Sequence, residues 1–304
     1  MTVLLCSGQG AQKPGMGADL LGIEEVADTF ACASDVLGVD LVKLTTEGSD
    51  EEINDAFNAQ ALTMTVSVGI GRALVARGLQ VDGFIGFSLG EISALALAEV
   101  LSLEDTYRLL KVRAQAMEKA CKEHAGAMLA LLGADEESAC KLCTDCAEGD
   151  VLVPANFNSL VQIVISGDVA AIDRAEAAWK ELGKRSARLK TAGAFHSPLM
   201  ASAAAELGEF CKTLSFSEPK VPILCNTDAA PFKADEAAQR LEKQVKSSVL
   251  FCQSVQNFAA QGEARFIEAG VGGVLFNLVK RIDKSLDRSK VGTKEEFDAL
   301  CETL

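Results

Sequence analysis

The sequence has little positive charge for its length of 304 residues. It contains 29 lysine and arginine residues against 43 aspartate and glutamate residues, which gives a formal net charge of −14 at pH 7. A surface that binds nucleic acid needs clustered lysine and arginine side chains. The charge balance therefore argues against nucleic acid as a partner, and we expect any acidic partner to bind a local basic patch.

The sequence also lacks the marks of secretion and of membrane insertion. It begins with a strand and has neither the charged n-region nor the apolar h-region of a signal peptide. We therefore expect its ten cysteines to be free thiols in a reducing compartment, mostly as small core residues. No apolar run approaches the roughly 20 residues of a membrane span, since even 92–103 is interrupted by Glu99. These features predict a cytoplasmic protein without membrane contact, or one of an organelle matrix if a transit peptide has been removed.

Three of the cysteines, Cys140, Cys143 and Cys146, have a spacing that is typical of part of a metal or iron–sulfur site. On a helix, however, a spacing of three simply places the thiols along one side. No fourth cysteine or histidine stands nearby to complete a ligand set. We therefore expect no metal site.

The order of apolar runs and helical patterns predicts an α/β protein. Buried strands are expected at 2–6, 79–85, 221–226 and 265–268. Helical segments are expected between and after them, such as 26–37, 50–76, 103–122 and 274–282. Residues 126–190 instead follow the order strand, helix, strand, strand, helix, strand of a ferredoxin-like unit. The prediction is a hydrolase-like large domain, residues 1–124 and 193–304, with a parallel sheet and a serine nucleophile elbow. A ferredoxin-like small subdomain, residues 125–192, is inserted into it.

The elbow is the segment Gly86-Phe87-Ser88-Leu89-Gly90, which lies between a short strand and a segment of good helix formers. Glycines two residues before and after the serine permit a strained strand-to-helix turn. Such a turn presents the serine hydroxyl beside the free N–H groups of the helix, an arrangement suited to acyl transfer. The alternative is a glycine-rich turn that happens to contain a serine.

Two further polar features lie in apolar surroundings. Gly8-Gln9-Gly10 follows the first strand and places an amide near its carboxyl end, where open α/β sheets bind ligands, although a turn without a ligand is the alternative. Arg113 lies on an otherwise apolar helical stripe with Tyr107, Leu110 and Met117. A buried guanidinium needs a partner, either a structural carboxylate or the carboxylate of a substrate.

The sequence has only two histidines. If Ser88 is a nucleophile activated by histidine, one of these must be its base. His124 lies in a polar turn and is expected to be exposed. His196 lies in a loop that leads from the insert back into the main domain, and it is the preferred candidate.

In these residues and the segments around them, the sequence resembles the malonyl-CoA:acyl carrier protein transacylases and, more distantly, the acyltransferase domains of fatty-acid and polyketide synthases. The resemblance covers nearly the whole chain. It rests on the segments 7–12, 86–91, 112–117, 155–159, 162–167, 193–198 and 268–270.

The resemblance implies a role for each of the candidate residues. Ser88 would be the nucleophile and His196 the general base and then acid, without an acidic third member, because in the family a main-chain carbonyl near 249–251 orients the histidine. The backbone N–H groups of Gln9 and Leu89 would hold the oxyanion. Arg113 would pair with the malonyl carboxylate. The candidate substrate contacts are Asn156, Asn158 and Phe195. A phenylalanine before the histidine, as at Phe195, resembles the malonyl-selective members of the family.

The resemblance also implies malonyl-CoA as substrate without a bound cofactor, an acidic acyl carrier protein as partner, and a monomer. Two basic clusters could bind the carrier protein, one with Lys180 and the preferred docking residues Lys184, Arg185, Arg188 and Lys190, and the other with Lys280, Arg281 and Lys284. Either cluster could instead be an ordinary solvated face.

The sequence departs from the family pattern at four places. Phe87 stands where most members have histidine, Leu160-Val161 replaces a Pro-Gly, Val271 replaces a proline and Leu250 replaces a polar residue. Two rival functions therefore remain. One is a serine thioesterase or hydrolase, although such enzymes usually place the histidine near the C-terminus. The other is a non-catalytic relative that binds carrier protein or CoA.

Overall fold

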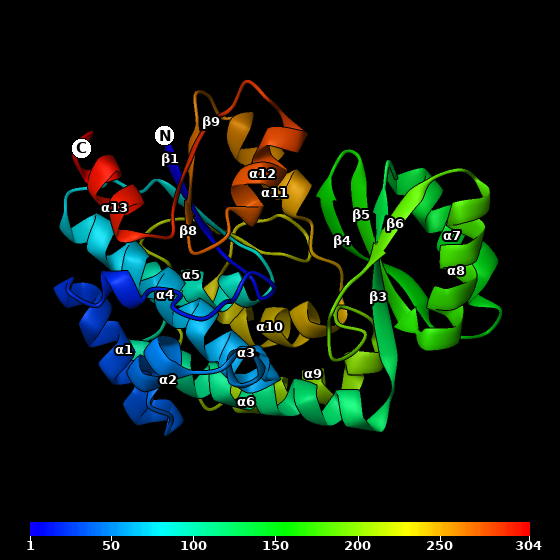
Figure 1. The fold of residues 1–304 in the computed structure, drawn as a ribbon, viewed down its shortest axis with the longest axis horizontal. Coiled ribbons are helices and arrows are strands. Elements are labelled where there is room, and N and C mark those ends of the chain that lie inside the picture. Colours follow the sequence, from blue (N-terminus) through cyan, green and yellow to red (C-terminus); the bar gives the residue numbers. More distant parts are fainter.

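The computed structural model describes residues 1–304 and contains two β-sheets that lie side by side, each with its own helices (Figure 1). The strands are β1 Thr2–Cys6, β2 Gly83–Gly86, β3 Gly126–Leu132, β4 Leu152–Ser159, β5 Gln162–Asp168, β6 Arg185–Arg188, β7 Ile223–Leu224, β8 Arg265–Ala269 and β9 Asp287–Val291. The α-helices are α1 Glu24–Leu37, α2 Leu41–Glu47, α3 Asp50–Asn54, α4 Ala56–Ala76, α5 Leu89–Leu97, α6 Leu103–Glu123, α7 Glu136–Ala147, α8 Val169–Glu181, α9 Ala201–Cys211, α10 Ala237–Lys246, α11 Phe251–Ala259, α12 Val274–Ile282 and α13 Lys294–Cys301.

The larger sheet is parallel throughout, in the order β7-β2-β1-β8-β9. Four of its strands confirm the predicted ones. The second is shorter than predicted, because pairing with β1 begins only at Gly83. The edge strand β9 was not predicted, since its sequence Asp-Arg-Ser-Lys-Val is polar and shows no apolar alternation.

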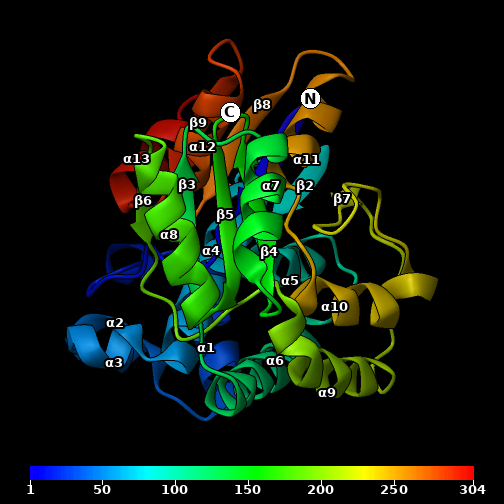
Figure 2. The same ribbon diagram turned by 90° about the vertical axis from the view of Figure 1, so that its right-hand side faces the viewer.

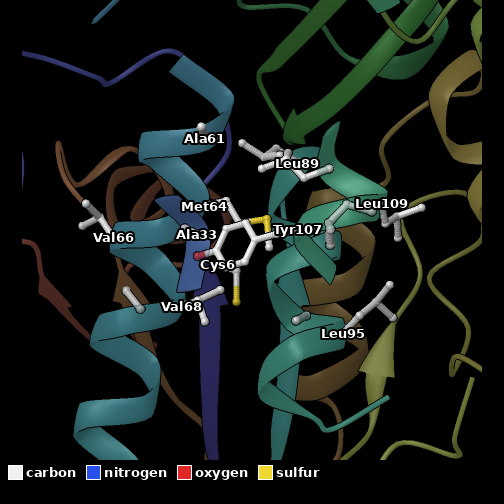
Figure 3. Close-up of a cluster of buried hydrophobic side chains, with 14 of the residues drawn as sticks. Cys6, Ala33, Ala61, Met64, Val66, Val68, Leu89, Leu95, Tyr107 and Leu109 are labelled. Atoms are coloured by element: carbon white, nitrogen blue, oxygen red, sulfur yellow. The ribbon is translucent and has the colours of Figure 1, made fainter. Parts of the chain in front are cut away.

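Both faces of the larger sheet are covered, so the strand β1 is apolar along its whole length. Leu4 and Cys6 point into the main core of 51 buried residues, which includes side chains of α4, α5 and α6. Val3 and Leu5 point into a second core of 15 residues, formed with α11 and α12. Figure 3 shows part of the main core around Tyr107, whose hydroxyl donates a hydrogen bond to Thr65 Oγ1 at 3.1 Å.

Helix α4 corrects two predictions. The expected single helix at 50–76 is interrupted at Asp55, whose carboxylate accepts hydrogen bonds from the N–H groups of Phe57 and Asn58 and so begins a new helix. The expectation that no apolar run approaches the length of a membrane span was also wrong. By length and composition alone, α4 could cross a membrane, because it has 21 residues and a mean hydropathy of 1.3. Of that window, 83% is buried inside the protein, which is typical of a core helix.

The smaller sheet is antiparallel, in the order β4-β5-β3-β6, and it contains the six predicted elements of residues 126–190. Helices α7 and α8 cover the face that is turned away from the larger sheet (Figure 2). The opposite face carries Met128, Ala130, Ala155 and Val164. The segment at Val249 pairs with the edge of β4, which ties the small sheet to the region before α11.

All ten cysteines are free, and six of them are buried. The predicted free thiols and core positions are therefore confirmed. Cys140, Cys143 and Cys146 do lie on one helix, α7, with Cys143 and Cys146 packed into the core of the small sheet. No group of three or more cysteine, histidine, aspartate or glutamate side chains is arranged to hold a metal ion.

Candidate active site

The predicted elbow is present between β2 and α5. Ser88 lies at the N-terminus of α5 with φ 53° and ψ −106°, a conformation that few residues other than glycine adopt. The flanking glycines are required by close packing. A Cβ atom at Gly90 would lie 2.0 Å from the carbonyl oxygen of Cys6, and one at Gly86 would lie 2.1 Å from the nitrogen of Glu91. The strained turn therefore depends on both glycines.

Ser88 and His196 are in direct contact. The distance between Ser88 Oγ and His196 Nε2 is 2.7 Å, although the two residues are 108 positions apart in the sequence. His196 is buried and Ser88 is half-buried. His124, in contrast, is exposed at the end of α6, as predicted. The structure thus brings together the two residues that the sequence proposed as nucleophile and base.

The other ring nitrogen of His196 faces two main-chain carbonyls. Nδ1 lies 3.0 Å from the carbonyl oxygen of Gln244 and 3.1 Å from that of Ser247. Because carbonyls only accept hydrogen bonds, Nδ1 carries the proton and Nε2 is free to accept one from Ser88. Main-chain carbonyls therefore orient the histidine, as expected. The expected position of the carbonyl, near 249–251, was wrong, because Gln244 and Ser247 at the end of α10 supply the carbonyls.

Burial lowers the pKa of His196 to about 4, and the nearby guanidinium of Arg113 contributes in the same direction. The backbone carbonyls at Nδ1 act against this shift, but they do not outweigh it. A neutral imidazole at physiological pH is able to accept the proton of Ser88.

Arg113 reaches the nucleophile from α6. Its Nη1 donates a hydrogen bond to Gln60 Oε1 at 2.6 Å and its Nη2 donates to Ser88 Oγ at 3.2 Å. The side chain is only 2% exposed, and Nε has no hydrogen-bond partner. No carboxylate pairs with Arg113, so the structural alternative raised by the sequence is not realised. Nε and Nη2 lie on the same edge of the guanidinium. On the edge that contacts Ser88, Nε is therefore a buried donor without a partner.

Gln9 and Leu89 line the same cavity as Ser88, Arg113 and His196. This cavity has a volume of about 110 Å³. The N–H of Leu89 belongs to the first turn of α5, where N–H groups have no intrahelical partner. Gln9 is exposed in the loop after β1. The two predicted donors are thus beside the nucleophile, at the carboxyl ends of neighbouring strands.

A larger cavity of about 390 Å³ adjoins the first and shares part of its lining. Asn156 lines both cavities and Asn158 lines the outer one. Both are buried, and Asn158 Oδ1 has no hydrogen-bond partner. Phe195 lines only the inner cavity, next to His196, whereas Lys190 lines both.

The other candidate docking residues differ in their surroundings. The amine of Lys184 lies 4.1 Å from the ring centre of Trp179, and the side chain of Arg185 makes no ion pair. Arg188 forms ion pairs with Asp173 and Glu176 of α8, so its charge is largely compensated. In the second cluster, Arg281 donates a hydrogen bond to Gln162 of the small sheet at 3.2 Å.

Phe87 lines both cavities and packs edge-on against Phe251, with 5.6 Å between the ring centres. Its ring also lies close to Gly8, where a Cβ atom would be 2.9 Å from Phe87 Cδ1. Phe87 therefore forms an apolar wall beside the nucleophile, and it makes no hydrogen bond to the serine or the histidine.

Sequence reasoning missed four buried polar residues of the site: Gln60, Glu91, Asn226 and Gln244. Gln60 and Glu91 gave a usable signal, because each is a polar residue within an apolar helical segment. Asn226 follows β7 at the edge where ligands bind in parallel sheets. Gln244 gave no signal, since a glutamine is ordinary in the polar, amphipathic sequence of α10.

Comparisons with known proteins find relatives over nearly the whole chain. The acyl transferase domain family matches residues 3–295. The malonyl CoA-acyl carrier protein transacylase of Escherichia coli K12 is 38% identical over 299 residues, which cover 97% of each chain. The crystal structure of a malonyl-CoA:acyl carrier protein transacylase from Xanthomonas oryzae is 39% identical, with a TM-score of 0.95 over 99% of this chain and 98% of that one. A second structure holds a type II polyketide synthase acyl carrier protein in complex with its malonyl-transacylase. It is 34% identical, with a TM-score of 0.96 over 100% of this chain and 99% of that one.

Proposed function

This chain belongs to the acyl transferase domain family, and we propose on that basis that it moves the malonyl group of malonyl-CoA to the phosphopantetheine thiol of an acyl carrier protein. The activity is that of an acyl-carrier-protein S-malonyltransferase. The observation that carries the proposal is the arrangement of Ser88, His196 and Arg113 in the inner cavity. A serine contacts a neutral histidine, and a buried arginine beside them has a donor, Nε, without a partner.

In the first half-reaction, His196 Nε2 accepts the proton of Ser88 Oγ while that oxygen attacks the thioester carbonyl. The backbone N–H groups of Gln9 and Leu89 hold the resulting oxyanion, and such a donor contributes about 3 kcal/mol in comparable sites. When the intermediate collapses, the carbon–sulfur bond breaks, His196 returns the proton to the sulfur of CoA, and a malonyl ester remains on Ser88.

In the second half-reaction, the carrier-protein thiol takes the place of CoA. His196 accepts its proton, the sulfur attacks the malonyl ester, and Ser88 Oγ leaves with the proton from His196. The cycle is therefore ping-pong, with malonyl-CoA as a substrate and no further cofactor. In this proposal the acidic third member of a triad is replaced by the carbonyls of Gln244 and Ser247.

Arg113 gives the site its selectivity for a substrate with a free carboxylate. Nε and Nη2 can bind the two carboxylate oxygens side by side, while Gln60 keeps Nη1 in place. The bound carboxylate would also satisfy Nε, whose burial without a partner is otherwise unfavourable. In the outer cavity, Asn156 and Asn158 are proposed to bind the amides of the phosphopantetheine arm, and Phe195 limits the space beside the malonyl group.

We also propose that the chain acts as a monomer, in the cytoplasm or an organelle matrix. Residues 1–124 and 193–304 form a hydrolase-like large domain, and residues 125–192 form a ferredoxin-like small subdomain. The strand order β4-β5-β3-β6 with two helices on one face supports the second assignment. Lys184, Arg185, Arg188 and Lys190 are proposed as docking residues for the carrier protein.

Mass spectrometry after brief incubation with malonyl-CoA tests the function directly. The expected result is a malonyl adduct on Ser88 that disappears when holo acyl carrier protein is added, with malonyl carrier protein formed in equal amount. A Ser88→Ala variant should form no adduct. Release of the adduct as free malonate at the same rate without carrier protein would indicate a hydrolase, and the absence of an adduct on the unaltered protein would indicate a non-catalytic relative.

A further inference from the structure

The backbone of Ser88 is held by two side chains from outside the elbow. The N–H of Ser88 donates a hydrogen bond to Asn226 Oδ1 at 2.8 Å, and Gln244 Nε2 donates to the carbonyl of Ser88 at 2.7 Å. Asn226 Nδ2 also donates to the carbonyl of Gly86 at 2.6 Å. Both polar groups of the strained residue are therefore bound, and Asn226 spans the turn from Gly86 to Ser88.

These contacts bear on the strain of the elbow. A backbone conformation such as that of Ser88 costs on the order of 1–3 kcal/mol and persists only when its surroundings fix it. Asn226 and Gln244 are 2% and 1% exposed, so their hydrogen bonds do not compete with water. They are able to keep Ser88 in the orientation that directs Oγ toward the histidine.

Gln244 binds the base as well as the nucleophile. Its side chain holds the carbonyl of Ser88, while its main-chain carbonyl accepts the hydrogen bond from His196 Nδ1. The next residue, Val245, accepts a hydrogen bond from the N–H of His196 at 3.2 Å. The end of α10 thus fixes the distance between the two reacting groups from both sides.

A buried carboxyl group anchors the two amides. Glu91 is 1% exposed, and its Oε2 accepts hydrogen bonds from the N–H of Asn226 at 3.0 Å and from Gln244 Nε2 at 3.5 Å. Gln244 Nε2 also lies 3.5 Å from Asn226 Oδ1. Three residues from α5, the end of β7 and α10 therefore form one connected network under the elbow.

We propose that Asn226 and Gln244 are positioning residues of the acyl transfer: Asn226 fixes the strained elbow, and Gln244 fixes the nucleophile relative to the base. Neither residue lines the inner or the outer cavity, so neither is proposed to contact the substrate. The inference rests on the proposed function for its substrate, and it concerns only the geometry of Ser88 and His196.

Two variants test the proposal, Asn226→Ala and Gln244→Met. The second keeps the main-chain carbonyl for His196 and removes only the amide that holds Ser88. In single-turnover reactions of the full-length protein with saturating malonyl-CoA, we expect the acylation rate constant to fall about 10²-fold, as for a misplacement of about 1 Å in other enzymes. The concentration of malonyl-CoA for half-maximal rate should change by less than about 3-fold, because Arg113 and Gln9 are untouched.

Asn257→Ala is the matched control. Asn257 Nδ2 donates a hydrogen bond to the carbonyl of Ala229 at 3.0 Å, so this variant also removes an amide-to-carbonyl bond, but one that contacts neither Ser88 nor His196. It should lower the melting temperature and leave the acylation rate constant unchanged. Acylation by folded Asn226→Ala and Gln244→Met at the rate of the control would overturn the proposal, as would a loss confined to substrate affinity.

A fluorophosphonate probe separates this inference from the proposed function, because it labels an activated serine without any malonyl group. Rapid labelling of the unaltered protein and about 10²-fold slower labelling of both variants would support the positioning role even if malonyl-CoA proved to be the wrong substrate. Equal labelling rates would contradict it even if malonyl transfer were established. Should Asn226→Ala fail to fold, Gln244→Met alone decides the result.

Discussion

At the scale of single residues, we propose that Arg113 distinguishes a malonyl donor from a neutral acyl donor. Two charge-assisted hydrogen bonds from Nε and Nη2 to a carboxylate contribute about 3 kcal/mol together. We therefore expect Arg113→Ala to reduce the preference for malonyl-CoA over acetyl-CoA by about 10²-fold, mainly through slower malonyl transfer. The measurement is the pair of acylation rate constants for the two thioesters.

Arg108 provides the control for this prediction. It lies on the same helix, but it is exposed and forms an ion pair with Asp105. Arg108→Ala should leave the preference between the two thioesters unchanged. An Arg113→Ala variant that still prefers malonyl-CoA would show that another group binds the carboxylate.

The low pKa of His196 predicts the pH dependence of acylation. With a pKa of about 4, His196 in the free protein becomes protonated, and inactive as a base, only as the pH falls through about 4. At limiting malonyl-CoA the rate should therefore be constant from pH 8 down to about 5 and decline below that. A decline centred near the ordinary histidine pKa of 6.5 would contradict the burial argument.

Substrate binding should move this decline. Part of the shift in the pKa of His196 comes from the positive charge of Arg113. A bound malonyl carboxylate compensates that charge, so the pKa of His196 rises in the complex. We expect the acidic limb of the single-turnover rate to lie at higher pH with saturating malonyl-CoA than with limiting malonyl-CoA. With saturating acetyl-CoA, which has no such carboxylate, this difference should be smaller.

At the scale of secondary-structure elements, the contact between β1 and the elbow leaves no room for a side chain at position 90. A Cβ atom at Gly90 would lie 2.0 Å from the carbonyl oxygen of Cys6 and 2.7 Å from its carbon, and neither backbone atom can move without shifting β1. We expect Gly90→Ala to lower the free energy of unfolding by about 2 kcal/mol or more, as overpacking does in other cores. It should also slow acylation, since the loop with Gln9 follows directly after β1.

Gly22→Ala is the corresponding control. No atom lies within 4 Å of the Cβ position at Gly22, so the added methyl group meets open space. Its effect on stability should stay within about 0.5 kcal/mol, which denaturant unfolding of both variants can measure. Equal stability of Gly90→Ala and Gly22→Ala would show that the end of β1 adapts more easily than its packing indicates.

The same elements show what the sequence could and could not predict. Ser88 and Gln9 were proposed because each lies in a short local pattern, and His196 because the sequence has only two histidines. Arg113 was proposed because a charge interrupts an apolar stripe. The contact of Gln244 with Ser88 joins residues 156 positions apart and depends on where α10 ends. No local pattern encodes such a contact. The helices α2 and α13 were also missed, because α2 is short and α13 follows the unpredicted strand β9.

At the scale of the whole molecule, the net charge of −14 works against binding of an acidic carrier protein. Lys184 and Arg185, at the start of β6, are exposed, form no ion pair and line neither cavity. Lys190 is also exposed, but it lines both cavities. Charge reversal at Lys184 and Arg185 therefore alters the surface of the small sheet and leaves the residues that line the two cavities unchanged. The carrier-protein step should be affected and the malonyl-CoA step should not.

We expect Lys184→Glu with Arg185→Glu to raise the apparent KM for carrier protein at least about 10-fold at low ionic strength. The effect should decrease as salt is added, because the Debye length falls to about 10 Å at 0.1 M. The matched control is Lys212→Glu with Lys220→Glu, which changes the net charge by the same amount at two exposed lysines that line neither cavity. If both pairs raise KM equally, long-range repulsion between the two proteins accounts for the effect. A selective effect of the first pair, with the rate of Ser88 malonylation unchanged, would place the carrier protein against β6.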